Sequence, residues 1–317
     1  MSVKFAIGIV FLALSYLQLL LPRHENYGDA PPYLWITLTV LGALFMLGII
    51  FLSEGVTEAV YEKSLLRAIF KNAHTLIAYL ALSMVGAIML DGVSQWLGKL
   101  WFYPVLNNAT YPIVFVFSFA LYWLMVIESY LAVKALLDLW RKGRHTVRTY
   151  FGFEPPLYTS LGALGIILIP IAAALMTNDY AVQRGGYVFE LTKAVDYKVN
   201  FSFILLMFFG TWFLFEAIEY FRKETSLLRD IFHHYFTPLI AVVVASLGTA
   251  LLMETQNLFA GSGAWTYTNW PFQEVTLLGL PAVMFFFWPI HYIFFLSLWR
   301  AFSDKESDEV WKGDLIK

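Results

Sequence analysis

Two nearly identical heptapeptides show how this sequence is organised: SLLRAIF at residues 64–70 and SLLRDIF at residues 226–232. They lie 162 positions apart and differ at a single position. The similarity extends upstream without a gap, where FLSE aligns with FLFE and pairs Glu54 with Glu216. A short match could reflect one kind of surface helix used twice, whereas a longer gapless match indicates an internal duplication.

The duplication continues downstream to the end of each half of the chain. Near the end of each half, IESY aligns with IHYI, which pairs Glu128 with His291. We therefore predict that residues 1–150 and residues 153–317 are two copies of one unit.

Long apolar runs indicate a membrane protein. The sequence is 59% hydrophobic and only 14% charged, against ~25% charged residues in an ordinary soluble domain. An α-helix needs about 20 apolar residues to cross the ~30 Å hydrocarbon core of a bilayer. Runs of that length lie at residues 3–22, 33–53, 74–95, 111–137, 157–177, 199–220, 237–256 and 273–299. We predict an all-α integral membrane protein with eight transmembrane helices, four in each copy.

The number of spans and the distribution of charge predict the topology. Four spans return the chain to its starting side, so the two four-helix units would form a parallel tandem repeat, related by an axis along the membrane normal. Alternate loops carry 16 and 5 of the 21 Lys and Arg residues, and the more basic side faces the cytoplasm. We expect both termini in the cytoplasm, an interfacial helix at residues 54–71, and the cytoplasmic membrane of a prokaryotic cell as the location.

Composition excludes several kinds of chemistry. A chain without cysteine offers no thiolate nucleophile, no disulfide and no cysteine ligand for iron–sulfur clusters or zinc. Of the six histidines only His233 and His234 are adjacent, which disfavours a metal centre or a haem. A net charge of −2 gives no reason to expect a nucleic-acid partner. We expect no metal and no cofactor; the expected partners are lipid or polyprenoid molecules, other membrane proteins, or further copies of the chain.

Ionisable residues inside the apolar runs are the first candidates for function, because a charge in hydrocarbon is costly. They form two layers. An outer layer holds the carboxylates Asp91, Glu254 and Glu274, the last at the expected start of the eighth helix. The aromatic residues beside them are Trp101, Tyr103, Trp265, Tyr267 and Trp270. An inner layer, toward the cytoplasm, holds Glu54, Glu128, Glu216, Glu219 and His291.

Each layer also has a purely structural explanation. Tryptophan and tyrosine collect at membrane interfaces without any further role. Carboxylates near helix ends can extend toward water and pair with cations of the loops. The presence of an acid at equivalent positions of both copies, Asp91 and Glu254, favours a functional role for the outer layer.

The outer layer resembles a motif of the membrane-embedded lycopene cyclases and related carotenoid-modifying proteins. In that family an acid ends one helix, G-x-W-x-Y follows about ten residues later, and Pro-x-Glu-Glu opens the next helix. Here DGVSQWLGKLWFYP starts at Asp91, and ETQNLFAGSGAWTYTNWPFQEV starts at Glu254 and includes Glu274. The first copy departs from the pattern, since the three residues after Pro112 include no carboxylate, and the family has three spans per copy.

The resemblance implies acid-catalysed cyclisation or hydration of an isoprenoid end group inside the bilayer. A carboxylic acid in apolar surroundings stays neutral and can donate a proton to an alkene. An ionised carboxylate and aromatic faces would stabilise the carbocation. Asp91, Glu254 and Glu274 would then be the catalytic acids, and the tryptophans and tyrosines of the outer layer would contact the substrate.

Two other classes of function remain open. A non-catalytic subunit that binds lipid or pigment in a larger membrane complex would account for the 18% aromatic content. A transporter is the second alternative, because parallel repeats occur in transporters.

Overall fold

The computed structural model describes residues 3–21, 32–107, 109–141, 151–184, 200–223, 226–259 and 265–303. Within these residues eight helical segments are long and apolar enough to cross a membrane, so the chain is a helical integral membrane protein. They are α1 (Val3–Ser15) with its 3₁₀ extension η1 (Tyr16–Leu20), α2 (Pro32–Tyr61), α4 (Ala73–Asp91) with its π-helical extension η3 (Gly92–Leu97), α5 (Tyr111–Trp140), α6 (Glu154–Arg184), α7 (Phe201–Lys223), α9 (Thr237–Phe259) and α10 (Met284–Phe302).

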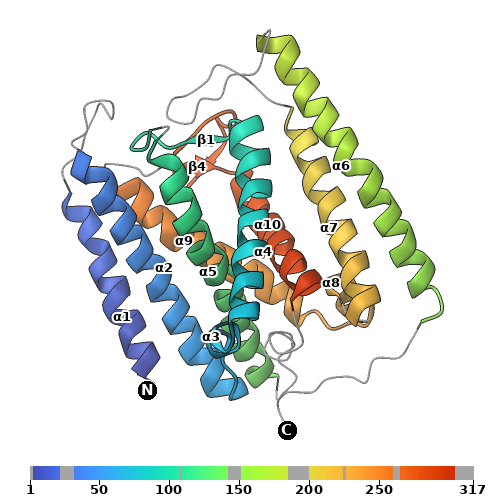
Figure 1. The fold of residues 1–317 in the computed structure, drawn as a ribbon, viewed down its shortest axis with the longest axis horizontal. Coiled ribbons are helices and arrows are strands. Elements are labelled where there is room, and N and C mark those ends of the chain that lie inside the picture. The colour runs from blue at the N-terminus through green and yellow to red at the C-terminus, as the bar shows by residue number, and fades with distance from the viewer. Residues whose placement is uncertain are drawn as a thin grey trace.

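The helices are arranged as two outer pairs around a central group (Figure 1). Helix α1 packs along α2 on one side, and α6 packs along α7 on the other. Between them lie α4, α5, α9 and α10. The packing partners correspond between the halves, because α2 packs on α5 as α7 packs on α10, and α4 on α5 as α9 on α10.

Glycines permit the close approach within each outer pair. A Cβ atom added to Gly8 of α1 would lie 2.7 Å from the backbone nitrogen of Leu52 in α2. A Cβ atom added to Gly165 of α6 would lie 2.5 Å from the carbonyl oxygen of Gly210 in α7. Any larger residue would force these helices apart, as in other membrane interfaces built on small residues.

The two heptapeptides form the short helices α3 (Leu65–Phe70) and α8 (Leu227–Phe232). Ser64 caps α3 by accepting a hydrogen bond from the Arg67 amide at 3.0 Å, and Ser226 caps α8 through the Arg229 amide at 3.1 Å. Both serines are buried. Serine suits these positions because its hydroxyl satisfies an amide that the first turn of a helix leaves free.

The predicted interfacial helix at residues 54–71 is wrong in its extent. Helix α2 continues through Glu54 to Tyr61, and a break at Glu62, which has a φ of 57°, separates it from α3. Glu54 is fully buried. Its carboxylate accepts hydrogen bonds from Lys4 of α1 and from the Ser64 hydroxyl, so this position faces the protein interior and not the membrane surface.

At the opposite end of the molecule, two short strands join the halves. Strand β1 (Trp101–Phe102) pairs antiparallel with β2 (Thr266–Tyr267), so that Trp101 lies opposite Tyr267. We call this end the ribbon end, and the end with α3 and α8 the short-helix end (Figure 1). The ribbon therefore brings the two W-x-Y motifs side by side.

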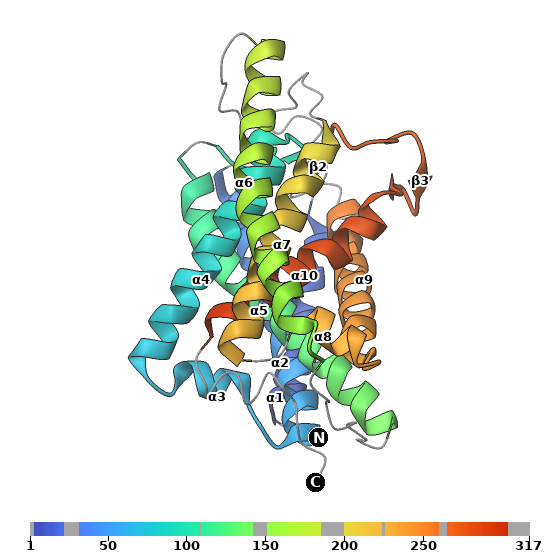
Figure 2. The same ribbon diagram turned by 90° about the vertical axis from the view of Figure 1, so that its right-hand side faces the viewer.

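The eighth span begins later than the predicted run at residues 273–299. Helix α10 starts at Met284, and the residues before it form a hairpin of β3 (Thr276–Leu277) and β4 (Leu280–Pro281). Its turn residues Leu278 and Gly279 have φ values of 54° and 80°, which a two-residue hairpin turn requires and a helix excludes. The hairpin projects from the body of the molecule (Figure 2). Apolar composition alone does not separate such a hairpin from a helix.

Candidate functional site

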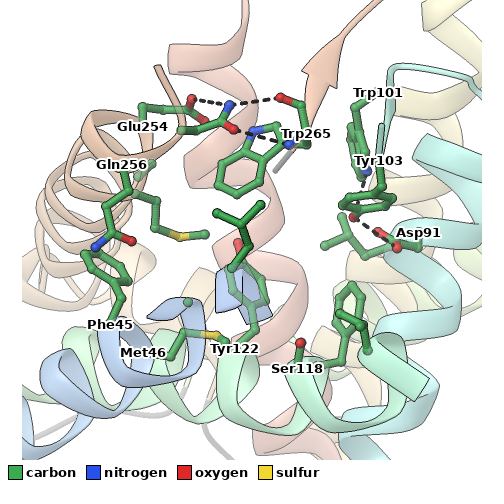
Figure 3. Close-up of a pocket in the computed structure, with 18 of the residues that line it drawn as sticks. Phe45, Met46, Asp91, Trp101, Tyr103, Ser118, Tyr122, Glu254, Gln256 and Trp265 are labelled. Atoms are coloured by element: carbon green, nitrogen blue, oxygen red, sulfur yellow. Dashed lines mark hydrogen bonds between the residues drawn. The ribbon is translucent and has the colours of Figure 1, made fainter. Parts of the chain in front are cut away.

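One cavity of about 280 Å³ lies near the ribbon end. Its walls come from α2, α4, α5, α9, α10 and the β1–β2 ribbon, and most of the lining is apolar or aromatic. Asp91 and Glu254 line this cavity on opposite walls (Figure 3). The outer-layer aromatic residues line it as well: Trp101, Tyr103, Trp265, Tyr267 and Trp270.

Asp91 is the last residue of α4 and is 1% exposed. Its Oδ2 atom accepts a hydrogen bond from the hydroxyl of Tyr103 at 3.3 Å and another from the hydroxyl of Tyr111 at 2.8 Å. Each phenol in turn accepts from an indole: Trp101 Nε1 lies 3.0 Å from Tyr103, and Trp96 Nε1 lies 2.9 Å from Tyr111. Within the described residues, Asp91 Oδ1 has no hydrogen-bond partner.

Glu254 occupies the corresponding place on the other wall, in α9, and is 4% exposed. Its Oε1 atom accepts a hydrogen bond from the hydroxyl of Tyr267, which accepts from Trp265 Nε1 at 2.7 Å. Its Oε2 atom accepts from Asn257 Nδ2 at 3.4 Å. Both oxygens of Glu254 are therefore occupied by donors from the chain.

The two tyrosines of the W-x-Y motifs act as donors at all ordinary pH values. Burial raises the pKa of Tyr103 and of Tyr267 well above the usual value for a phenol. The neighbouring carboxylates, Asp91 and Glu254 respectively, raise the pKa further. A phenol that stays protonated can orient the carboxyl group but does not exchange protons with it easily.

His291 lies in this cavity and not in the inner layer where the sequence suggested it. It is 4% exposed, on α10, and its Nε2 atom lies 2.6 Å from the hydroxyl of Tyr122 on α5. The two rings are stacked, with centroids 5.9 Å apart. Because α10 starts late, its first turns reach the cavity and bring His291 with them.

Glu274 is exposed and does not line the cavity. It lies in the segment before the β3–β4 hairpin, ten residues ahead of α10, so it does not cap that helix. Trp270, which precedes this segment, lines the cavity and donates a hydrogen bond from Nε1 to the Leu100 carbonyl at 2.8 Å.

The remaining inner-layer residues are fully buried but lie outside the cavity lining. Glu54 accepts a hydrogen bond from Lys4 of α1 at 3.0 Å, and Glu219 forms an ion pair with Arg300 of α10. Glu216 accepts from Trp212 Nε1 at 2.8 Å. Their partners come from helices and not from loop cations, so they do not extend toward water as the structural explanation assumed.

Three residues of the site were missed from the sequence: Tyr111, Tyr122 and Asn257. Asn257 follows Glu254 by three positions on one helix, and that spacing places the two side chains on a common face. Tyr111 and Tyr122 leave no such signal, because only the packing of α5 brings them to the cavity.

Comparison with known proteins gives no relative: no family model, no curated protein and no solved structure matches this chain. Among the described residues no group of three or more His, Asp or Glu side chains could hold a metal ion. The geometry of the cavity therefore carries the functional argument.

Proposed function

We propose that this protein is a membrane-embedded enzyme that protonates an isoprenoid end group of the carotenoid type and so catalyses its cyclisation or hydration. The observation that carries the proposal is the position of Asp91 and Glu254 on opposite walls of one apolar, aromatic cavity. Low polarity favours a neutral carboxylic acid, which is the species that can protonate an alkene.

The reaction needs one acid, one charge stabiliser and one base. The acid adds a proton to a terminal C=C bond and leaves a carbocation. In cyclisation, the next C=C bond attacks this cation, and loss of a proton from a neighbouring carbon gives an isomer of the substrate. In hydration, water attacks the cation and then loses a proton. In both cases the proton returns to the enzyme.

The hydrogen bonds distinguish the two acids. Asp91 keeps Oδ1 free of partners within the described residues, so this oxygen is available to carry and donate the proton. Each acid accepts two hydrogen bonds, but Asp91 takes both on Oδ2 and Glu254 takes one on each oxygen, so Glu254 has no oxygen left without a donor. We assign proton donation to Asp91 and stabilisation of the cation to Glu254, a role that the sequence suggested for Glu274.

The aromatic walls suit the same chemistry. Trp101 and Trp265 line the cavity, and the face of an indole ring attracts a cation through its quadrupole. A cavity of about 280 Å³ is larger than the ~150 Å³ that admits benzene. It can take one ring-sized end of a long polyene, whose remainder would stay among the lipids.

We also propose that the two halves of the chain are a parallel tandem duplication. The matched caps of α3 and α8 and the matched Trp–Tyr–acid chains support a two-fold relation about the membrane normal. We also propose that the short-helix end faces the cytoplasm, as the charge distribution predicts.

The orientation can be measured directly because the chain has no cysteine. In intact cells, Glu274→Cys near the ribbon end is expected to react with an impermeant maleimide. Arg67→Cys, on exposed α3 at the other end, is expected to react only after lysis. The opposite labelling pattern would reverse the orientation.

The catalytic proposal is tested by expressing the protein in cells that accumulate lycopene and analysing the extracted carotenoids. Cyclisation changes the absorption spectrum without changing the mass, and hydration adds the mass of one water. Asp91→Asn should strongly reduce product formation while the membrane content of the protein stays constant. Lycopene and related polyprenoids that remain unchanged with folded wild-type protein would contradict the proposal.

The second candidate is a subunit that binds a pigment or lipid without converting it. It is favoured by the tyrosine hydrogen bonds, which give both acids a structural role in joining the ribbon to α4 and α9. In this case a polyene would co-purify unchanged, and Asp91→Asn would alter retention of the pigment but no product would form in any variant.

A further inference from the structure

Two buried carboxyl groups meet between α2 and α5, outside the cavity. Glu54 of α2 and Glu128 of α5 are each 0% exposed, and their carboxyl groups lie within hydrogen-bonding reach of one another. The two helices pack along each other over much of their length. The pair therefore lies at a helix contact, toward the short-helix end.

The surroundings supply too few donors for two carboxylates. Glu54 Oε1 accepts from Lys4 Nζ at 3.0 Å and from the Ser64 hydroxyl. The other Glu54 oxygen and both Glu128 oxygens receive no hydrogen bond from the described residues. Lys4 is also shared with Glu58 at 2.9 Å, so its charge is already distributed over two carboxylates.

Two acceptors that face each other in a buried helix contact need a hydrogen between them. If both were ionised, like charges would repel at close range in surroundings of low polarity. One shared proton removes one charge and supplies the missing donor, as in paired carboxylates elsewhere. We propose that Glu54 and Glu128 form a buried proton-binding site that holds one proton between α2 and α5.

Among the described residues of the second half, the matched positions form no such pair. Glu216, at the position matched to Glu54, accepts from Trp212 Nε1 at 2.8 Å and from the Leu228 amide at 3.3 Å, and it also contacts Ser226. The position matched to Glu128 is His291, which lies in the cavity. Glu216 is therefore a buried carboxyl group with donors and without a second acid, which makes it a matched control.

Other titratable groups around the pair are Lys4 on α1, Glu58 on α2 and Tyr79 on α4. Lys4 is the cation whose charge acts on Glu128. The hydroxyl of Tyr79 lies close enough to Glu128 for a Coulomb interaction, but it donates its hydrogen bond to the Ala120 carbonyl. Neither group replaces the shared proton, because Lys4 Nζ pairs with Glu54 and Glu58, and the Tyr79 hydroxyl donates to the Ala120 carbonyl.

Infrared spectroscopy of the purified full-length protein in lipid vesicles detects the proton through the carbonyl stretch of a protonated carboxyl group. The difference spectrum between wild type and Glu128→Gln at neutral pH should contain this band. The corresponding difference for Glu216→Gln should contain much less of it. The glutamine amide can donate to Glu54 in place of the proton, so Glu128→Gln is expected to fold.

The pH dependence of wild-type stability is a second measurement, and it does not depend on whether a variant folds. The pair should take up one proton on folding at neutral pH, in addition to any proton that Asp91 binds, and should contribute about a tenfold fall in the folding equilibrium constant per unit rise in pH. Glu128→Gln should lose this component. Identical infrared spectra for wild type and Glu128→Gln would overturn the proposal. Stability that follows the concentration of Na⁺ instead of pH would also overturn it, since a metal ion would then occupy the pair.

Discussion

The two halves of the molecule agree at the ribbon end and differ at the short-helix end. At the ribbon end, Trp101, Tyr103 and Asp91 form the same hydrogen-bonded chain as Trp265, Tyr267 and Glu254. At the short-helix end, matched positions have different surroundings. Glu54 meets a second carboxyl group, whereas Glu216 meets an indole and a backbone amide.

This difference shows which features depend on both halves together. The cavity needs both acid-bearing walls, so a change in one half alters a site that the other half also builds. At the short-helix end, the matched glutamates have their donors within their own halves: Lys4 for Glu54, and Trp212 with the Leu228 amide for Glu216. Such separate contacts can diverge without disturbing the common cavity.

The largest effect is expected from the two acids of the cavity. Acid–base catalysis contributes ~10²–10⁴-fold to a rate. Asp91→Asn, which removes the donor, should lower kcat for the polyene toward the upper end of this range, and Glu254→Gln should lower it by ~10²-fold. Product formation per folded protein, by chromatography of carotenoid extracts, gives the measurement.

Glu274→Gln is the control for both acids, because Glu274 lies outside the cavity. It should leave kcat close to that of the wild type. A loss as large as that of Asp91→Asn would return Glu274 to the catalytic role that the sequence suggested.

The close helix contacts are expected to give the next largest effect, and an equal one in both halves. Gly8→Ala and Gly165→Ala place a methyl group against backbone atoms, and such overpacking costs ~1–3 kcal/mol of unfolding free energy. Gly248→Ala, where nothing lies within 4 Å of the added atom, should not destabilise the protein. Denaturant titration in mixed micelles measures all three; a cost in only one half would break the correspondence of the outer helix pairs.

Removing the tyrosine hydroxyls should affect the second half more than the first. Tyr103→Phe leaves Asp91 with the hydrogen bond from Tyr111 at 2.8 Å, but Tyr267→Phe leaves Glu254 with only the longer one from Asn257 at 3.4 Å. A hydrogen bond to a charged group is worth ~1.5–3 kcal/mol. We expect about a tenfold or greater loss of kcat for Tyr267→Phe and a smaller loss for Tyr103→Phe; the reverse order would contradict the assignment of charge to Glu254.

The smallest effect is expected at the caps of the heptapeptides. Ser64→Ala and Ser226→Ala each remove an N-cap, which costs ~1 kcal/mol. The two unfolding free energies should fall by similar amounts, since both serines also bond to a matched glutamate. Ser64→Asp and Ser226→Asp would separate the cap from the glutamate contact, because aspartate caps a helix but repels a neighbouring carboxylate.

Part of the site could be read from the sequence. The positions of Asp91 and Glu254 within the apolar runs at residues 74–95 and 237–256 predicted two acids at one depth, because helix rise converts position along a helix into depth. The predictions from the sequence were wrong where the conformation of a segment depends on the residues that follow it. Glu274 follows an apolar pattern that fits a helix, yet Leu278 and Gly279 turn the chain into a hairpin.

The sequence by itself determined the helical class of the protein and its eight helices long and apolar enough to cross a membrane. Those properties depend on the length and apolarity of local segments, because each helix that crosses a bilayer must meet these requirements by itself. Only the tertiary structure decided that Asp91 and Glu254 face one cavity, that His291 joins them, and that Glu54 meets Glu128. The physical reason is that the burial and hydrogen bonding of these groups depend on contacts between helices far apart in the chain. The spacing of residues within one segment does not determine which helices pack together.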